Sequence, residues 1–179
     1  MSIRLGILGI GSMGRHHVRN ARATQGVELV ALADPGGDRF GVAGNLPVLG
    51  GVEELIEAGI DAAIIAAPTA HHEAAALALA EAGVHTLVEK PLATSVEAGT
   101  RIRDAFAAAG LVGAVGYVER CNPALIDMRR RIAQGQLGEI EQIATRRQSP
   151  FPARISDVGV VKDLATHDVD LAAWVAGAP

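Results

Sequence analysis

The first residues whose types and spacing could do chemistry are three glycines near the start of the chain, Gly9, Gly11 and Gly14. They follow an apolar run over residues 3–9 and open a helical stretch over residues 13–24. In this pattern the first glycine permits a tight turn, the second lets the backbone approach a pyrophosphate, and the third lets helix and strand pack closely. The helix N-terminus then offers N–H groups and a positive dipole end to the phosphates. The residues expected to hold a dinucleotide here are Gly9, Gly11, Ser12, Met13 and Gly14.

An acidic residue, Asp34, stands 20 positions after Gly14, at the end of a second apolar run over residues 28–33. Its carboxylate can accept hydrogen bonds from both hydroxyls of an adenosine ribose and would repel a 2′-phosphate. The sequence therefore favours NAD over NADP. The alternative is that Asp34 only caps the turn that follows it. S-adenosylmethionine-dependent methyltransferases also carry glycine loops, but their glycine pattern is usually looser.

A third candidate is the tripeptide Glu89-Lys90-Pro91, which follows an apolar run over residues 84–88. In a doubly wound sheet the carboxyl ends of the strands face the ligand crevice. We therefore expect Lys90 at the reactive end of the cofactor, where it can hydrogen-bond a substrate hydroxyl or exchange a proton with it. Standing alone, the tripeptide could equally be a surface lysine before a turn.

A histidine between two carboxylates is the fourth candidate. Asp163, His167 and Asp170 are spaced i, i+4 and i+7, which places them on one helix face. Such a histidine has a stabilised imidazolium and a fixed orientation, both of which suit a general base near neutral pH. The alternative is an acid-rich helix start with a solvated histidine. The group lacks enough oriented ligands for zinc, so we predict no metal.

The elements that position these residues alternate between short apolar runs and helix-length amphipathic stretches. This alternation is typical of a parallel sheet covered by helices on both faces, and right-handed crossovers make it doubly wound. We therefore predict an α/β Rossmann domain over residues 1–119. The expected strands are 3–9, 28–33, 61–67, 84–88 and 111–118, and the expected helices are 13–24, 52–58, 72–82 and 96–109. The glycine-rich stretches 36–37 and 41–51 are expected to be loop with at most a short helix.

The pattern changes after residue 119. A helix is expected over residues 122–134, a half-buried strand over 139–148 and a second helix over 162–176. One strand between two helices cannot form a stable sheet by itself. Residues 120–179 therefore read as the start of a second domain that this chain does not complete.

Composition excludes several classes of function. The net charge of −4 argues against a nucleic-acid-binding surface, which needs clustered Lys and Arg. The single cysteine, Cys121, permits no internal disulfide and indicates a cytoplasmic protein. No signal peptide is visible, and no apolar run approaches the length of about 18 residues that a membrane span needs. We therefore expect neither a nucleic acid nor a membrane as partner.

Taken together, the glycine loop, Glu89-Lys90-Pro91 and the Asp163–His167–Asp170 pattern resemble the Gfo/Idh/MocA oxidoreductases, the glucose-fructose oxidoreductase and inositol dehydrogenase group. The resemblance covers the whole chain. The segment after residue 67 also resembles the family's stretch along the nicotinamide half of NAD, and Arg120 matches a polar position where the family crosses into its substrate domain. The further cofactor contacts that the resemblance implies are Ala67, Pro68, Thr69, His72, Glu89, Lys90 and Arg120.

The resemblance also implies an activity. Lys90 and His167 would handle the proton, and Asp163 would contact the substrate or orient His167. The reaction would move a hydride between the nicotinamide and a secondary alcohol of a sugar, nucleotide sugar or cyclitol. The Lys-Pro peptide is often cis in the family, and the second domain is an α+β open sheet that usually forms a homo-oligomer interface. The alternative is an NAD-binding sensor or regulatory module without turnover.

Overall fold

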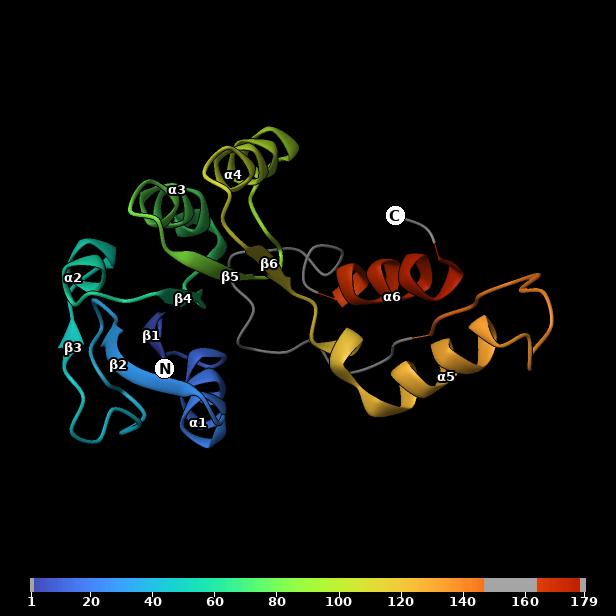
Figure 1. Ribbon diagram of the computed structural model, residues 1–179, viewed down its shortest axis with the longest axis horizontal. Helices are drawn as coiled ribbons and strands as arrows, with labels where there is room; N and C mark the ends of the chain where they lie inside the picture. Colours follow the sequence, from blue (N-terminus) through green and yellow to red (C-terminus); the bar gives the residue numbers. More distant parts are fainter. Residues whose placement is uncertain (1, 147–163, 178–179) are drawn as a thin grey trace. The chain divides into compact units, whose positions relative to one another are not determined.

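The computed structural model describes residues 2–146 and 164–177, and it divides the chain into two units, 1–116 and 117–179 (Figure 1). The first unit is built on one sheet of six strands in the order β3-β2-β1-β4-β5-β6, and every pair of neighbours is parallel. This is the strand order of a Rossmann domain, so the predicted fold class is confirmed. The strands are β1 Ile3–Leu8, β2 Val27–Ala33, β3 Val48–Leu49, β4 Ala62–Ile65, β5 His85–Glu89 and β6 Gly113–Gly116.

The helices of the first unit cover both faces of this sheet (Figure 1). One face packs on α1 and the residues that precede β3, around Ile7, Val18 and Leu32. The other face packs on three helices, around Leu55, Ile65 and Leu79, which are all fully buried. The helices are α1 Gly14–Ala23, α2 Val52–Glu57, α3 His72–Glu81 and α4 Val96–Ala108, with a 3₁₀ turn η1 at Thr69–His71. Burial on both faces explains why the strands read as continuous apolar runs rather than alternating ones.

Strand β3 corrects the expectation that residues 41–51 form only loop and short helix. Val48 and Leu49 pair with Leu32 and Ala33 of β2. The strand is two residues long, which is too short to give a hydrophobic period in the sequence. Its existence depends on the edge of β2 rather than on local propensity.

The second unit contains a 3₁₀ turn η2 (Val118–Cys121) and the helices α5 (Pro123–Ala133) and α6 (Thr166–Ala176). Helix α5 begins as its sequence predicts, because the Asn122 side chain accepts a hydrogen bond from the Ala124 N–H and Pro123 occupies the first turn. The two helices meet where the Arg129 guanidinium lies 4.5 Å from the centre of the Trp174 ring.

The strand predicted over residues 139–148 is wrong for its described part. Residues 139–146 have no regular secondary structure, and their side chains are exposed. Alternating polarity stabilises a strand only when a neighbouring strand supplies the ladder of hydrogen bonds, and no described strand lies in this unit.

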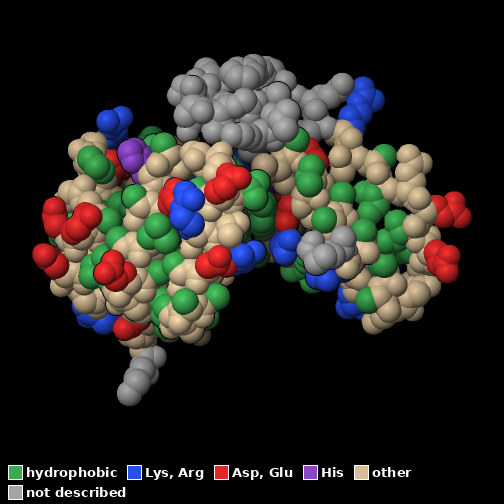
Figure 2. Space-filling model, turned by 90° about the horizontal axis from the view of Figure 1, so that it is seen from above, with side chains coloured by type: hydrophobic (Ala, Val, Ile, Leu, Met, Phe, Trp, Pro, Cys, Tyr) green, Lys and Arg blue, Asp and Glu red, His purple; other side chains and the backbone are tan. Residues whose placement is uncertain are grey.

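Charged side chains of both signs are interspersed over the described residues of the face shown in Figure 2. This distribution is in keeping with the modest net charge of −4. None of the described helices combines the length and the apolar character needed to cross a membrane.

Candidate cofactor and active site

The predicted site residues of the first unit gather at the carboxyl ends of four neighbouring strands. The glycine loop follows β1, Asp34 follows β2, residues 67–69 follow β4, and Lys90 follows β5. Because β2, β1, β4 and β5 are adjacent and parallel, these four segments emerge at the same edge of the sheet. This edge is where ligands bind in open α/β sheets.

Each glycine of the loop has a distinct steric reason. Gly9 has a φ of +86°, and a Cβ there would lie 2.6 Å from the backbone nitrogen of Ala67. A Cβ on Gly14 would overlap the carbonyl oxygen of Gly9. A Cβ on Gly11, in contrast, would meet no protein atom within 4 Å. The first and third glycines are therefore required by the fold, whereas the second faces open space that a pyrophosphate can fill.

The start of helix α1 fits the same ligand. Its N-cap residue, Met13, makes no side-chain cap, and the first turn carries no acidic residue. Ser12 and Met13 are both exposed. The positive end of the helix dipole is therefore not capped by an acidic side chain of its own first turn, which suits the phosphates of a dinucleotide.

The Asp34 carboxylate links the glycine loop to the turn after β2. One oxygen accepts a hydrogen bond from the Ile10 N–H at 3.0 Å, and the other accepts from the Gly36 N–H at 2.8 Å. The turn-capping role that was the alternative for this residue is therefore real. It does not exclude a ribose contact, because each carboxylate oxygen has two lone pairs.

Replacing Asp34 with Asn should weaken NAD binding by about 10-fold, because one charge-assisted hydrogen bond at the loop is lost. The preference for NAD over NADP should fall as well, since the amide no longer repels a 2′-phosphate. Titration calorimetry with each dinucleotide measures both effects. An unchanged ratio of the two dissociation constants would show that Asp34 does not select the cofactor.

The segment after Asp34 folds over the outer side of α1. The Asp38 carboxylate accepts hydrogen bonds from the N–H groups of Ala43 and Val42, which lower its pKa. The Arg15 guanidinium carbon lies 4.8 Å from the centre of the Phe40 ring. These contacts fix the loop that flanks Asp34.

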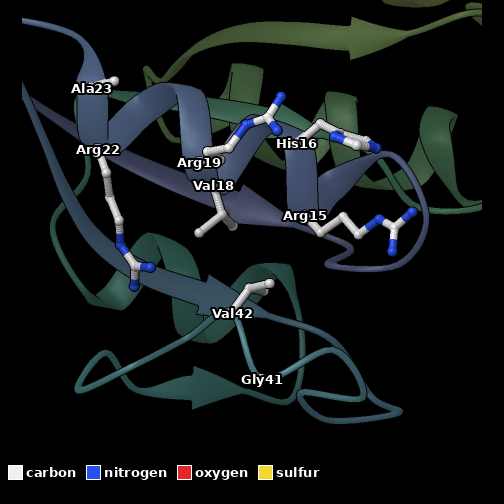
Figure 3. A pocket seen from close by; sticks show the side chains of 8 residues that line it. All are labelled: Arg15, His16, Val18, Arg19, Arg22, Ala23, Gly41 and Val42. Atoms are coloured by element: carbon white, nitrogen blue, oxygen red, sulfur yellow. The ribbon is translucent and has the colours of Figure 1, made fainter.

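A groove of about 640 Å³ lies between α1 and residues 41–42 (Figure 3). Its arginine side chains do not converge on one point, since Arg19 and Arg22 point to opposite sides of the helix. Arg22 also donates to the carbonyl oxygen of Ala43 at 2.6 Å. The groove therefore lacks the arrangement of an anion site.

The turn after β5 is held through its acidic residue. Glu89 is 7% exposed, and one carboxylate oxygen lies 2.7 Å from Nε2 of His17 on α1. Its other oxygen accepts a hydrogen bond from the backbone N–H of Lys90 at 3.2 Å. The Lys90–Pro91 peptide is cis, as the resemblance implied, and Lys90 itself is half-buried. Both oxygens of the Glu89 carboxylate thus contact groups of the protein itself.

His72 was expected to lie against the cofactor, and the structure places its ring inside the protein. The side chain is 1% exposed. Nε2 lies 2.8 Å from the carbonyl oxygen of Ala67, and Nδ1 lies 3.0 Å from that of Pro91. The ring therefore joins the segment after β4, where Thr69 is also buried, to the turn that carries Lys90.

The second unit places two of the predicted residues in one ion pair. Arg120 donates to both oxygens of Asp170, with a shortest distance of 2.5 Å, and the Asp170 side chain is 8% exposed. This hydrogen bonding raises the pKa of Arg120, and burial, followed by the charge of Asp170, raises the pKa of Tyr117. One of the carboxylates expected to flank His167 is therefore already bound to a cation.

His167 lies half-buried in the first turn of α6, as the spacing predicts. Its predicted partner Asp163 lies outside the described residues.

The sequence interpretation missed His17, although it stands one turn after Gly14 on the helix that follows the glycine loop. A histidine at that position, together with a glutamate at the end of a nearby strand, was the available signal.

The comparison that decides the family is a match over most of the chain. The model of an oxidoreductase family with an NAD-binding Rossmann fold, Gfo/Idh/MocA, matches residues 3–117. The chain belongs to the Gfo/Idh/MocA oxidoreductases. Its first unit is the NAD-binding domain of that family, and the resemblance drawn from the motifs is confirmed.

Two curated relatives show which kinds of protein this chain is similar to. The scyllo-inositol 2-dehydrogenase (NAD(+)) of Bacillus subtilis is 33% identical over 98% of this chain and 54% of its own length. The UDP-N-acetylglucosamine 3-dehydrogenase of Acidithiobacillus ferrooxidans is 32% identical over 98% of this chain and 55% of its own length. The chain thus spans about half the length of the curated relatives that it matches.

A solved member of the family has the same fold. The crystal structure of scyllo-inositol dehydrogenase from Lactobacillus casei with bound NAD(H) and scyllo-inositol gives a TM-score of 0.81 at 21% identity. It covers 99% of this chain and 57% of that protein. At this identity the likeness demonstrates the shared fold.

Proposed function

We propose that the full-length protein is an NAD-dependent dehydrogenase that oxidises a secondary alcohol on a cyclitol, sugar or nucleotide sugar. The observation that carries the proposal is Lys90. It follows β5, at the edge of the sheet where the glycine loop and Asp34 also lie. This sheet belongs to the NAD-binding domain of an oxidoreductase family.

The residues that would hold NAD are the glycine loop at the start of α1 and Asp34 at the ribose. When bound there, NAD supplies the acceptor for the hydride that leaves the alcohol carbon. Lys90 or His167 takes the proton of the hydroxyl group, and Lys90 stabilises the developing oxyanion by its charge and a hydrogen bond. Asp163 orients His167 or contacts the substrate.

The substrate class rests on the relatives. Two of them, at 33% and 32% identity, are named as dehydrogenases of scyllo-inositol and of UDP-N-acetylglucosamine. Both names describe a ring that bears secondary hydroxyl groups. We extend that class, and no single member of it, to this protein.

We also propose a cytoplasmic location and a homo-oligomeric assembly. The single cysteine supports a cytoplasmic protein, because cytoplasmic chains carry few or no disulfides. Membership of the family supports a homo-oligomer formed through the second domain.

The test is a panel of inositols, hexoses and UDP-sugars offered to the full-length protein with NAD, with NADH absorbance as the readout. The proposal expects turnover with at least one ring alcohol and far less with NADP in place of NAD. Tight binding of NAD with no turnover on any member of the panel would contradict an enzyme and would support the sensor alternative.

A further inference from the structure

We propose that His17 is a positioning residue that holds the phosphate-binding helix in register with the turn carrying Lys90. The inference rests on the proposed function, because it assigns His17 a role toward the same reaction. It concerns a side chain that contacts neither substrate nor reacting atoms, and it acts through Glu89.

His17 lies one turn after Gly14 on α1, the helix whose N-terminus we assign to the cofactor phosphates. Its Nε2 lies 2.7 Å from a carboxylate oxygen of Glu89, which is the last residue of β5. A carboxylate only accepts hydrogen bonds, so Nε2 carries the hydrogen and donates it. The two side chains are 19% and 9% exposed, so water competes little for this bond.

Glu89 cannot leave this position easily. Its second oxygen accepts the Lys90 N–H at 3.2 Å. A Cβ on Gly116, at the end of β6, would lie 3.0 Å from the Glu89 carboxyl group, so the glycine makes room for it. The carboxylate is therefore packed between α1, the Lys90 turn and the end of β6.

This arrangement joins two parts of the site that the sequence places 72 residues apart. The helix that positions the cofactor and the backbone that positions Lys90 share one carboxylate. Loss of the His17 hydrogen bond leaves one oxygen of the buried Glu89 carboxylate without that donor, and this weakens the link between α1 and the Lys90 turn. A displacement of about 1 Å at a reacting group can cost 100-fold in rate.

The test compares His17→Asn with His17→Gln in the full-length protein. The Gln amide nitrogen reaches about as far as Nε2, whereas the Asn amide nitrogen stops near the place of Nδ1 and cannot reach Glu89. His16→Asn is the matched control, because His16 is the neighbouring histidine of α1 and lines the outer groove instead. Each variant is measured for thermal unfolding, NAD dissociation constant, kcat and KM. Hydrogen exchange is followed over residues 89–92 at the amides of Glu89, Lys90 and Leu92, because proline has no amide hydrogen.

The proposal expects His17→Asn to lower kcat by about 100-fold with a smaller rise in the KM for the alcohol. Amide exchange at residues 89–92 should accelerate in the same variant. His17→Gln should recover both quantities, and His16→Asn should match the wild type. If His17→Asn fails to fold, the proposal still requires His17→Gln to fold with wild-type exchange at residues 89–92.

Wild-type exchange and kcat in His17→Asn would overturn the proposal, as would equal losses in the Asn and Gln variants. These failures are separate from failure of the proposed function. If the wild type turns over no ring alcohol, the proposed function fails, while the exchange measurement still decides whether His17 holds the Lys90 turn.

Discussion

Replacing Lys90 with Met is expected to lower kcat by about 1000-fold while NAD affinity stays within about threefold of wild type. The methionine keeps an unbranched side chain of similar length but removes the charge and the proton. Lys90 follows β5, where we propose that it acts on the alcohol, whereas we assign the cofactor contacts to the glycine loop and Asp34. Steady-state rates and calorimetry on the same preparation measure the two quantities.

The control is Arg103→Met on α4, an exposed residue whose only described polar partner is the adjacent Asp104. It removes a cation from the same domain without touching the site, so turnover should not change. Retention of more than a tenth of the wild-type kcat in Lys90→Met would contradict a role for Lys90 in proton transfer.

Alanine at Gly14 should lower the stability of the protein, whereas alanine at Gly11 should lower its affinity for NAD. At Gly14 the added Cβ overlaps the Gly9 carbonyl oxygen, so the loop must move and the protein should lose about 3 kcal/mol of unfolding free energy. This reverses the usual gain of about 1 kcal/mol when Gly becomes Ala in a helix. At Gly11 the Cβ meets no protein atom, so stability should stay within about 1 kcal/mol of wild type.

Cofactor affinity distinguishes the same pair. The methyl group of Gly11→Ala occupies the space assigned to the pyrophosphate, so NAD should bind about 100-fold more weakly to a protein that is otherwise folded. Denaturant unfolding and NAD titration on each variant give both numbers. A Gly11→Ala variant with wild-type NAD affinity would show that the pyrophosphate does not lie against this loop.

The sequence predicted the parts of the site that depend on local pattern. The glycine spacing, the acidic residue after β2 and the lysine after β5 each follow an apolar strand, and the parallel order of strands then brings them to one edge. Strand β3 escaped prediction because two residues carry no period. The strand expected near residue 140 failed because pairing, rather than alternation, makes a strand.

Contacts between side chains that lie far apart in the sequence could not be predicted from it. His72 reads as a ligand contact because it follows the segment after β4, but its ring nitrogens lie within 3.0 Å of two carbonyl oxygens, one of them in the Lys90 turn. Asp170 reads as a partner of His167, but it pairs with Arg120, which lies 50 residues earlier. Glu89 and His17 are likewise distant in sequence. Such pairs depend on packing between elements, which periodicity along one element does not encode.

Direct hydride transfer from the alcohol carbon to NAD, which the proposed function requires, is tested by isotope labelling. The substrate identified by the panel is prepared with deuterium on the carbon that bears the reacting hydroxyl group, and the NADH formed is examined by mass spectrometry and NMR. We expect one deuterium on carbon 4 of the nicotinamide, on a single face of the ring. NADH that carries no deuterium would contradict it.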